Sequence, residues 1–310
     1  MATAGAWRAL LSGLVDYAGL FPPAGLDMAG AVARYAAYRR GPRAWMLGRF
    51  VVPLGRLGEF EADAGPLLPR GAYAVPWRLS VIATGAPAED AAAIDDFNDA
   101  HRGEDAGRVV IDSAERRAAT VEDVRAAAAA VASGTVRVAY EVPLGGALPS
   151  LARAVAAAGG VLKARLGGLT PDAIPASDAV AAWLAAGAQA GVRVKATAGL
   201  HHAMRGPYPL TYDEGSPRAV MHGFVNVFVA AALAWRHRAA TAEAIAALCV
   251  PVLEETDARA FRAVGGGLAW RRETIGESEL EDARADFAAA FGSCSFEEPV
   301  EELRALGLMG

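Results

Sequence analysis

Residues 191–202 read GVRVKATAGLHH, and this stretch predicts the architecture of the chain. Between residues 192 and 197, valine and alanine alternate with arginine, lysine and threonine, as in a strand whose two faces meet different surroundings. A tight turn and two adjacent histidines follow. Residues 161–168, VLKARLGG, show the same pattern, in which an apolar run reaches a lysine and then glycine. The two stretches predict neighbouring parallel strands that carry chemically active side chains.

Apolar, β-branched runs alternate with alanine-rich helical patterns along the rest of the chain. We predict strands at 45–52, 77–83, 108–112, 136–142, 161–165 and 192–197, with helices at 88–100, 121–132, 148–158 and 179–190. A seventh strand within 223–228 and an eighth near 268–272 would complete the set, although 219–236 also reads as a buried helix. Since no GxGxxG follows the first strand, this α/β rhythm favours a TIM-like (β/α)8 barrel over a doubly wound sheet.

The ends of the chain have helical patterns of their own. Asp27 is expected to cap a helix that runs to Arg40, and Ser295 and Glu298 have the spacing of a capping box before a terminal helix. A further helix is expected at 279–291. We therefore predict a single domain over residues 1–310, with an N-terminal helical cap (1–43), the barrel (44–275) and a C-terminal helical extension (276–310).

Composition restricts the class of protein. The net charge is −5 and the isoelectric point is about 5.6, which argues against binding to nucleic acid or to an anionic membrane surface. Cys249 and Cys294 provide neither a disulfide framework nor a paired metal-ligand spacing. The longest apolar run, 219–235, contains His222 and Asn226 and is too polar for a membrane span. We expect a cytoplasmic protein without a secretory signal that acts on a small molecule, alone or as a homo-oligomer.

Lysine is almost absent from the chain. Of the 30 basic residues, 28 are arginine and only Lys163 and Lys195 are lysine. Arginine keeps its proton in proteins, whereas a lysine amine can be neutralised and can then act as a base or as a Schiff-base nucleophile. Two lysines at matching strand positions therefore indicate a chemical role for at least one of them.

Side-chain alternation predicts where these groups point. Glu141 shares a strand face with Arg137 and Ala139. In the same way, Lys163 shares a face with Arg165, and Lys195 shares one with Thr197. In a barrel this face points to the axis, and polar groups near the carboxyl ends of the strands form the active site. The pattern predicts that the mouth of the barrel holds Glu141 and both lysines, with Arg165 as a clamp for an anionic substrate.

The pair KARLGG (163–168) and KATAGL (195–200) resembles the two lysine motifs of class I aldolases of the deoxyribose-phosphate aldolase type. The resemblance implies that Lys163 forms the Schiff base and that Lys195 lowers the pKa of its neighbour. It also implies that the first lysine lies on the sixth strand of the barrel, whereas the strands predicted above place it on the fifth.

Histidines after the second lysine suggest a further set of roles. His201 and His202 follow the turn at 198–199, so one of them is expected to face the mouth, and His201 is the candidate for moving protons. With His222 and Glu141, they would also form a His/carboxylate site for a divalent metal ion, with His202 and His222 as ligands. The protein is therefore expected to use either no cofactor or one divalent metal ion.

Several further residues are candidates for holding the substrate. Arg205 is a second clamp for a carboxylate or phosphate, and the glycine pair after the first lysine strand would offer backbone amides to an anion. Cys294, in GSCSFEEP, is interpreted as part of a compact turn rather than as a nucleophile. The remaining expected substrate contacts are Gly167, Gly168, Thr197, Tyr212 and Asn226.

These features support three hypotheses for the function. The first is carbonyl chemistry, as in an aldolase, lyase or isomerase, on a small anionic metabolite through a lysine- or metal-stabilised enamine or enolate. The second is a metal-dependent hydrolase or lyase that uses His201, His202, His222 and Glu141. The third is a barrel that binds a small molecule without catalysis.

Overall fold

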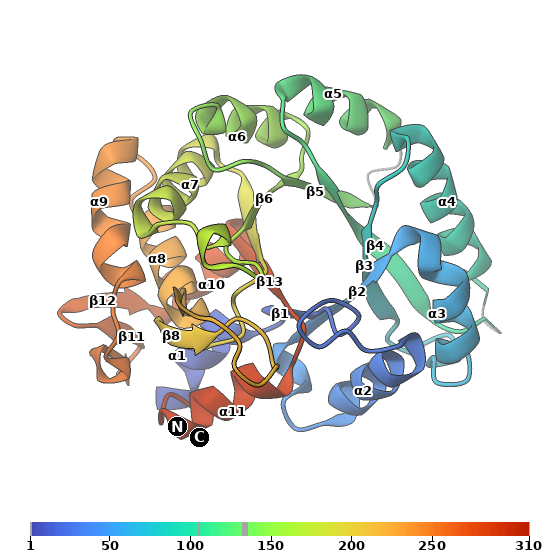
Figure 1. Cartoon of the computed structure of the whole chain (residues 1–310), viewed down its shortest axis with the longest axis horizontal. Helices are drawn as coiled ribbons and strands as arrows, with labels where there is room; N and C mark the ends of the chain where they lie inside the picture. Colours follow the sequence, from blue (N-terminus) through green and yellow to red (C-terminus); the bar gives the residue numbers. More distant parts are fainter. Residues whose placement is uncertain (1, 104–105, 132–135, 310) are drawn as a thin grey trace.

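The computed structural model describes residues 2–103, 106–131 and 136–309 and contains a closed, parallel, eight-stranded barrel (Figure 1). Around the barrel the strands follow the order β1-β13-β7-β6-β5-β4-β3-β2, and the pairing of β1 with both β13 and β2 closes the ring. The barrel strands are β1 (Val15–Tyr17), β2 (Leu47–Pro53), β3 (Trp77–Ile82), β4 (Val109–Arg117), β5 (Arg137–Glu141), β6 (Val161–Arg165), β7 (Arg193–Thr197) and β13 (Ala288–Ser293). The predicted (β/α)8 barrel is confirmed.

Helices surround this barrel, as Figure 1 shows. None of the helices in the described ranges combines the length and the apolar character needed to cross a membrane. The α-helices are α1 (Ala2–Leu11), α2 (Met28–Arg40), α3 (Leu57–Ala64), α4 (Pro87–Ala100), α5 (Val121–Ala130), α6 (Leu148–Ala157), α7 (Ser177–Ala190), α8 (Phe224–Arg236), α9 (Ala242–Leu253), α10 (Glu277–Asp286) and α11 (Glu297–Ala305). Short 3₁₀ turns occupy Ala44–Met46, Leu54–Arg56, Pro171–Ala173 and Ala258–Ala260.

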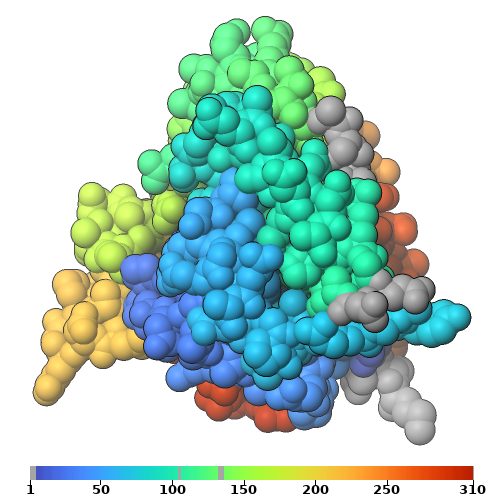
Figure 2. All heavy atoms as spheres, turned by 90° about the vertical axis from the view of Figure 1, so that its right-hand side faces the viewer, coloured from blue at the N-terminus to red at the C-terminus, as the bar shows by residue number. Residues whose placement is uncertain are grey.

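Two small antiparallel sheets lie outside the barrel. The hairpin of β8 (Gly206–Pro209) and β9 (Arg218–Met221) belongs to the long loop after β7, and it projects from the body of the molecule as the yellow segment of Figure 2. The second sheet contains β10 (Phe261–Val264), β11 (Gly267–Trp270) and β12 (Glu273–Gly276). The predicted eighth strand near 268–272 is β11, so it forms part of this sheet and not of the barrel.

The predicted ends of the barrel are wrong, because its first and last strands lie in the segments assigned to the two extensions. β1 has only three residues, all of them buried, which is too short to display a two-residue period. β13 has the sequence AAAFGS, whose alanines continued the helical pattern predicted for 279–291. The structure ends that helix at Asp286. The barrel therefore extends from residue 15 to residue 293, beyond the predicted limits of 44 and 275.

The segment 223–228, predicted as a possible seventh strand, lies in the helix α8. Each residue from Phe224 to Ala234 is buried, and α8 contacts α7, α9, α10 and β13. A helix surrounded on all sides by other elements is apolar around its whole circumference, and it therefore lacks the amphipathic period that would distinguish it from a buried strand. The alternative helix prediction for 219–236 is confirmed from Phe224 onward, whereas residues 219–221 belong to β9.

Most of the other predicted elements are confirmed. Asp27 caps α2 by accepting a hydrogen bond from the Gly30 amide at 2.8 Å, and Ser295 accepts one from the Glu298 amide at 3.2 Å before α11. The helices α4, α5, α6 and α7 lie where the alanine-rich patterns placed them. The predicted end of α5 at residue 132 lies outside the described residues.

An aromatic cluster docks α2 onto the first strands of the barrel. The buried Tyr35 of α2 contacts Phe50 of β2 and Trp77 of β3, with ring centroids 5.4 Å and 5.1 Å apart in edge-to-face arrangements. Its hydroxyl donates a hydrogen bond to the Gly48 carbonyl at 2.9 Å. Aromatic pairs of this kind contribute about 0.5–1.5 kcal/mol beyond the area they bury. This packing holds β1 in place, because Tyr17 contacts the same cluster.

Candidate active site

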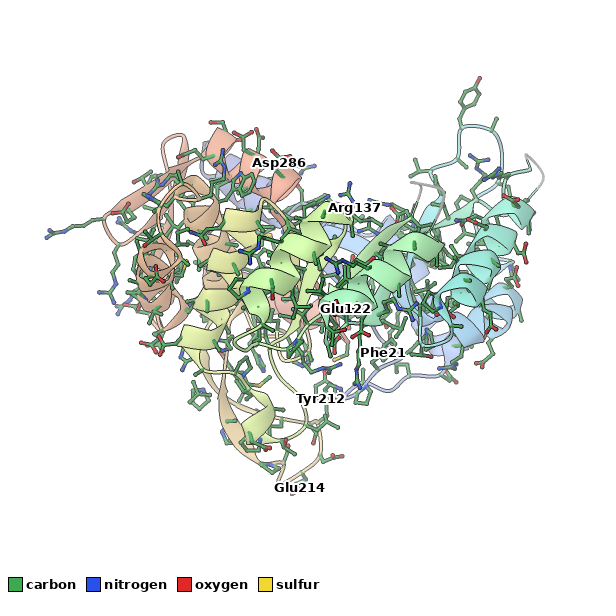
Figure 3. The ribbon with its side chains drawn as sticks, turned by 90° about the horizontal axis from the view of Figure 1, so that it is seen from above. Phe21, Glu122, Arg137, Tyr212, Glu214 and Asp286 are labelled. Atoms are coloured by element: carbon green, nitrogen blue, oxygen red, sulfur yellow. The ribbon has the colours of Figure 1, made fainter. Side chains whose placement is uncertain are left out.

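A cavity of about 620 Å³ opens at the carboxyl ends of the barrel strands. Its walls come from the ends of the strands and from loops that follow them, including one after β1 that carries Phe21 and one after β7 that carries His201 and Leu210. Figure 3 shows Phe21 and Tyr212 toward one end of the barrel, with Arg137 and Asp286 toward the opposite end. This position is where active sites of (β/α)8 barrels are found.

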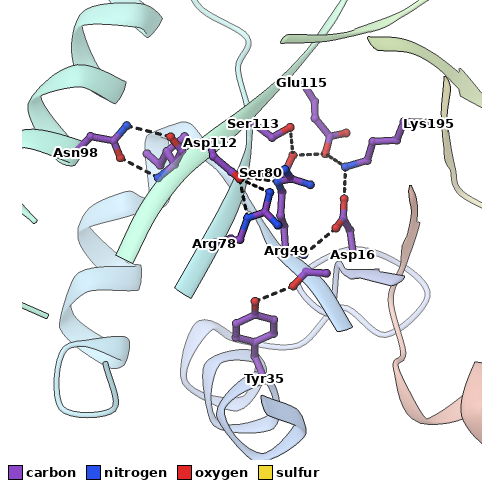
Figure 4. A network of polar contacts seen from close by, with 12 residues as sticks. Asp16, Tyr35, Arg49, Arg78, Ser80, Asn98, Asp112, Ser113, Glu115 and Lys195 are labelled. Carbon is purple, nitrogen blue, oxygen red and sulfur yellow. Dashed lines mark hydrogen bonds and ion pairs between the residues drawn. The ribbon is translucent and has the colours of Figure 1, made fainter. Parts of the chain in front are cut away.

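A chain of alternating charges crosses the barrel interior below this cavity. Lys195 Nζ lies 2.5 Å from Asp16 Oδ2 and 2.8 Å from Glu115 Oε1. Lys163 Nζ lies 2.7 Å from Glu115 Oε2 and 2.8 Å from Glu141 Oε2. The two lysines thus bind the two oxygens of one carboxylate, and Figure 4 shows the part of the network around Lys195, Glu115 and Asp16.

The two lysines line different cavities of the barrel. Both side chains are only 5 % exposed, and their Cα atoms are register partners on β6 and β7. Lys163 lines the cavity at the carboxyl end, whereas Lys195 lines a separate cavity toward the amino ends of the strands. Lys163 is therefore the amine that a molecule in the mouth of the barrel can reach.

Counting from β1, Lys163 is on the sixth barrel strand and Lys195 is on the seventh. The prediction from sequence placed them on the fifth and sixth because it missed β1.

Glu115 is the central residue of the network, and the sequence interpretation missed it. Its side chain is 3 % exposed and accepts a hydrogen bond from Ser80 Oγ at 2.6 Å in addition to the two lysine contacts. β4 was predicted to end at Asp112, but it continues to Arg117 after a β-bulge at that aspartate. The alternation of Ser113 and Glu115 with Ala114 was the available signal for a continued strand.

Charge interactions determine the ionisation of the network. Burial alone would raise the pKa of Glu115 and lower the pKa of Lys195, because it penalises the charged forms. The ammonium groups of Lys163 and Lys195 outweigh burial and hold the pKa of Glu115 well below its usual range. Asp16 and Glu115 likewise raise the pKa of Lys195. Lys195 therefore remains a fixed cation next to the carboxylate that binds Lys163.

Glu141 is on the mouth side of Lys163, as predicted. Burial would raise the pKa of this carboxyl group, but Lys163 and then Arg165 lower it overall. Arg165 Nε lies 3.4 Å from Glu141 Oε1, and the arginine side chain is 49 % exposed. Glu141 is therefore an ionised carboxylate in contact with the amine that faces the cavity.

Arginines make the mouth of the cavity cationic. Arg165 lines the cavity as predicted, and Arg116 and Arg117 of β4 line it as well. Arg116 is anchored to Asp90 at 3.4 Å, while Arg117 is largely exposed and lies 3.8 Å from Glu141. With Lys163, four cationic side chains of the described residues line the cavity against two carboxylates. An anionic molecule is favoured in such a site.

His201 lines the cavity together with Cys294. The Cys294 thiol lies 3.3 Å from His201 Nδ1 and 3.6 Å from the Tyr212 hydroxyl. Burial and then the neighbouring His202 lower the pKa of His201 to about 4, so this imidazole is neutral near pH 7. Burial also raises the pKa of the Cys294 thiol. Cys294 was interpreted from sequence as a turn residue and not as a nucleophile, and the structure adds that its side chain lines the cavity.

The predicted metal ligands do not converge. His202 Nδ1 lies 2.5 Å from Glu302 of α11 and its ring stacks on Tyr208. His222 is fully buried, with Nε2 2.8 Å from the Pro175 carbonyl. Each ring thus has partners of its own, and the structure gives no support to His202 and His222 as a ligand pair. The described residues contain no group of three or more side chains arranged to hold a metal ion.

The predicted substrate contacts divide into two groups. Thr197 and Gly168 line the cavity, and Tyr212 reaches its wall through Cys294. Arg205 and Asn226 do not line it: the Asn226 side chain accepts a hydrogen bond from the Arg205 amide at 2.9 Å and donates to two carbonyl groups. The structure therefore gives the Asn226 side chain and the Arg205 amide a role in supporting the base of the hairpin loop.

Gly167 has a backbone role and does not line the cavity. A Cβ atom on this residue would lie 2.7 Å from the Cα atom of Gly199, so the turns after β6 and β7 pack against each other without room for a side chain. Gly199 has a φ of +70° and the preceding Ala198 has a φ of +57°. Gly168 and His201, which follow these two turns, both line the cavity.

Comparisons with known proteins do not assign this chain to a family. No family model matches the chain, and no curated protein matches it either. The fold, the charge network and the cavity are therefore the observations on which a function can be based.

Proposed function

We propose that this protein is a Schiff-base enzyme of carbonyl chemistry, of the aldolase or lyase type, with Lys163 as the nucleophile. The observation that carries the proposal is the contact of Lys163 with the cavity on one side and with two carboxylates on the other. The (β/α)8 barrel commonly hosts enzymes, with their active sites at this end. The resemblance of the lysine motifs to class I aldolases supports the same chemistry.

The first step would be attack of the Lys163 amine on a substrate carbonyl carbon. Glu141 Oε2, 2.8 Å from Nζ, is within reach to take the proton that the nitrogen must lose. The carbinolamine would then expel water and form an iminium ion. Lys195 would stay protonated below it and, through Glu115, would keep a positive charge close to the reacting nitrogen.

The iminium ion would next accept the electrons of the breaking carbon–carbon bond and become an enamine. The leaving fragment would become a carbonyl compound as its hydroxyl loses a proton to a base. His201 is neutral near pH 7 and lines the same cavity, so it is our candidate for this base. Protonation of the enamine carbon and hydrolysis of the iminium ion would release the second product and restore the amine.

The proposed substrate is small and anionic. Arg165 and Arg117 are exposed enough to meet a phosphate or carboxylate group at the mouth, and Arg116 lies beside them. Guanidinium groups bind such anions through paired hydrogen bonds. Apolar residues of the loop after β1, including Phe21, would cover the carbon skeleton.

The test is reductive trapping. The protein would be incubated with pyruvate, glyoxylate or glyceraldehyde 3-phosphate, treated with sodium borohydride, and mapped by peptide mass spectrometry. Because the chain has only two lysines, the adduct can be assigned without ambiguity. We expect the adduct on Lys163 and not on Lys195, with the α-amino group of the chain as the measure of background labelling.

Two variants provide the controls. Lys163→Arg keeps the charge but removes the nucleophile, so it should lose the adduct while the far-ultraviolet circular dichroism remains that of the wild type. Arg153→Lys introduces a new lysine on the exposed face of α6 and should be labelled only at the background level. Labelling of Lys163 no greater than that of residue 153, across all three carbonyl compounds, would overturn the proposal. A barrel that binds its ligand without catalysis would then be favoured.

A further inference from the structure

A second cavity lies at the opposite end of the barrel from the proposed active site. It has a volume of about 270 Å³ and is lined by residues of the barrel strands. Five cationic side chains line it against two carboxylates, counted over the described part of the chain. The cations are Arg49, Arg78, Arg137, Arg193 and Lys195, and the carboxylates are Asp16 and Asp112.

The two aspartates are already engaged by three of these cations, as Figure 4 shows. Asp112 accepts hydrogen bonds from Arg49 Nε at 2.6 Å and from Arg78 Nε at 2.6 Å. Asp16 binds Lys195 and accepts a hydrogen bond from the Arg49 amide at 2.7 Å. Both carboxylates of this cavity are therefore already paired with Arg49, Arg78 and Lys195.

Arg137 of β5 and Arg193 of β7 also line this cavity. Within the described residues, neither forms an ion pair with a carboxylate, and the buried Arg193 Nε has no hydrogen-bond partner. Burial first, and then the positive charges of Arg137 and Arg49, lower the pKa of Arg193, while Asp286 opposes this effect. Two guanidinium groups that repel each other therefore border a polar cavity that is open to solvent.

We propose that this amino-terminal cavity is a binding site for a small dianion of the phosphate type. Arg137 and Arg193, which have no carboxylate partner among the described residues, would supply charge-assisted hydrogen bonds to its oxygens. The volume suits inorganic phosphate or a small phosphate monoester. Lys195 and the charge network separate this site from the mouth cavity, so the anion here would not be the substrate.

Isothermal titration calorimetry with inorganic phosphate at low ionic strength tests the proposal, because surface charges are weakly screened there. The lower site would be disabled in the double variant Arg137→Gln/Arg193→Gln, and the mouth site in Arg165→Gln. An exposed arginine on α6, changed as Arg153→Gln, serves as the matched control.

The expected result is a phosphate-binding event that the Arg137→Gln/Arg193→Gln variant weakens about tenfold or more. Arg165→Gln and Arg153→Gln should retain this event. Loss of charge repulsion should leave the double variant folded, which its thermal melting curve checks. The proposal is overturned if wild-type protein binds no phosphate at millimolar concentration. It is equally overturned if the double variant binds phosphate as the wild type does, or if only Arg165→Gln abolishes binding.

Discussion

Replacing Glu115 by glutamine removes the negative charge that joins the two lysines while keeping the size of the side chain. Glu115 is 3 % exposed, and its oxygens lie 2.7 Å from Lys163 Nζ and 2.8 Å from Lys195 Nζ. Breaking a buried ion pair by removing one partner typically costs about 3–5 kcal/mol, because a buried charge is left without compensation. We therefore expect the Glu115→Gln protein to lose about this much free energy of unfolding at pH 7.

The dependence on pH makes this prediction specific. An unfolded glutamate has a pKa of about 4.3, whereas the folded protein holds the pKa of Glu115 well below that range. The ionised Glu115 therefore contributes its full stabilisation above about pH 4.3 and loses it as the pH falls toward the folded pKa. The difference in stability between wild type and Glu115→Gln should shrink by about 1 kcal/mol between pH 4.3 and pH 3.3, because the unfolded glutamate is already half protonated at pH 4.3.

Urea unfolding followed by circular dichroism, at several pH values between 3.3 and 7, measures both quantities. Glu122→Gln on the exposed surface of α5 is the matched control, and it should change the stability little at any pH. A Glu115→Gln protein as stable as the wild type at pH 7 would refute the reasoning. A stability difference that stays constant down to pH 3.3 would refute it as well.

Two further changes probe the cavity wall and the turns that form it. The pKa of His201 is about 6.5 in the unfolded chain and about 4 in the folded protein. As the pH falls from about 6.5 to about 4, the unfolded state takes up a proton before the folded state does, so the free energy of unfolding declines. His201→Gln should decline less over that range in urea unfolding, and an unchanged slope would contradict the assigned burial. Gly199→Ala adds a Cβ atom 2.8 Å from the Cα atom of Gly167 at a φ of +70°, whereas Gly191→Ala, at a φ of +63°, adds one into open space. Gly191→Ala should lower the free energy of unfolding by about 1–2 kcal/mol from backbone conformation alone. Gly199→Ala should lower it clearly more, as measured by thermal melting. Equal losses in the two variants would show that the turns after β6 and β7 can separate.

The pattern of alternating residues was sufficient to predict the class of fold and the direction of the key side chains. Lys163, Glu141 and Arg165 were expected at the carboxyl end of the barrel, and the structure places them there. This succeeded because alternation along a strand is a local property, which each segment displays independently of the rest of the chain. The helices α4 and α7 were predictable for the same reason, since their composition and their ends are also local features.

The closure of the barrel could not be predicted from the sequence of any single segment. β1 has three residues, β13 resembles a continued helix, and α8 lacks a polar face, so none of these segments shows a period that distinguishes strand from helix. Their assignment depends on pairing: β13 becomes a strand because it fills the gap between β1 and β7. Hydrogen bonds to these two neighbours satisfy backbone groups that would otherwise be buried without partners.

The partners of the charged groups also depend on tertiary contacts. Lys195 meets Glu115 from 80 positions away in the chain and Asp16 from 179 positions away, so no spacing motif could reveal either pair. From sequence alone, His202 and His222 were both candidates for a metal site. In the folded protein His202 contacts Glu302, and His222 contacts the Pro175 carbonyl. Residue type limits which chemistry a side chain can perform, but burial and the charges brought beside it by folding decide which chemistry is available.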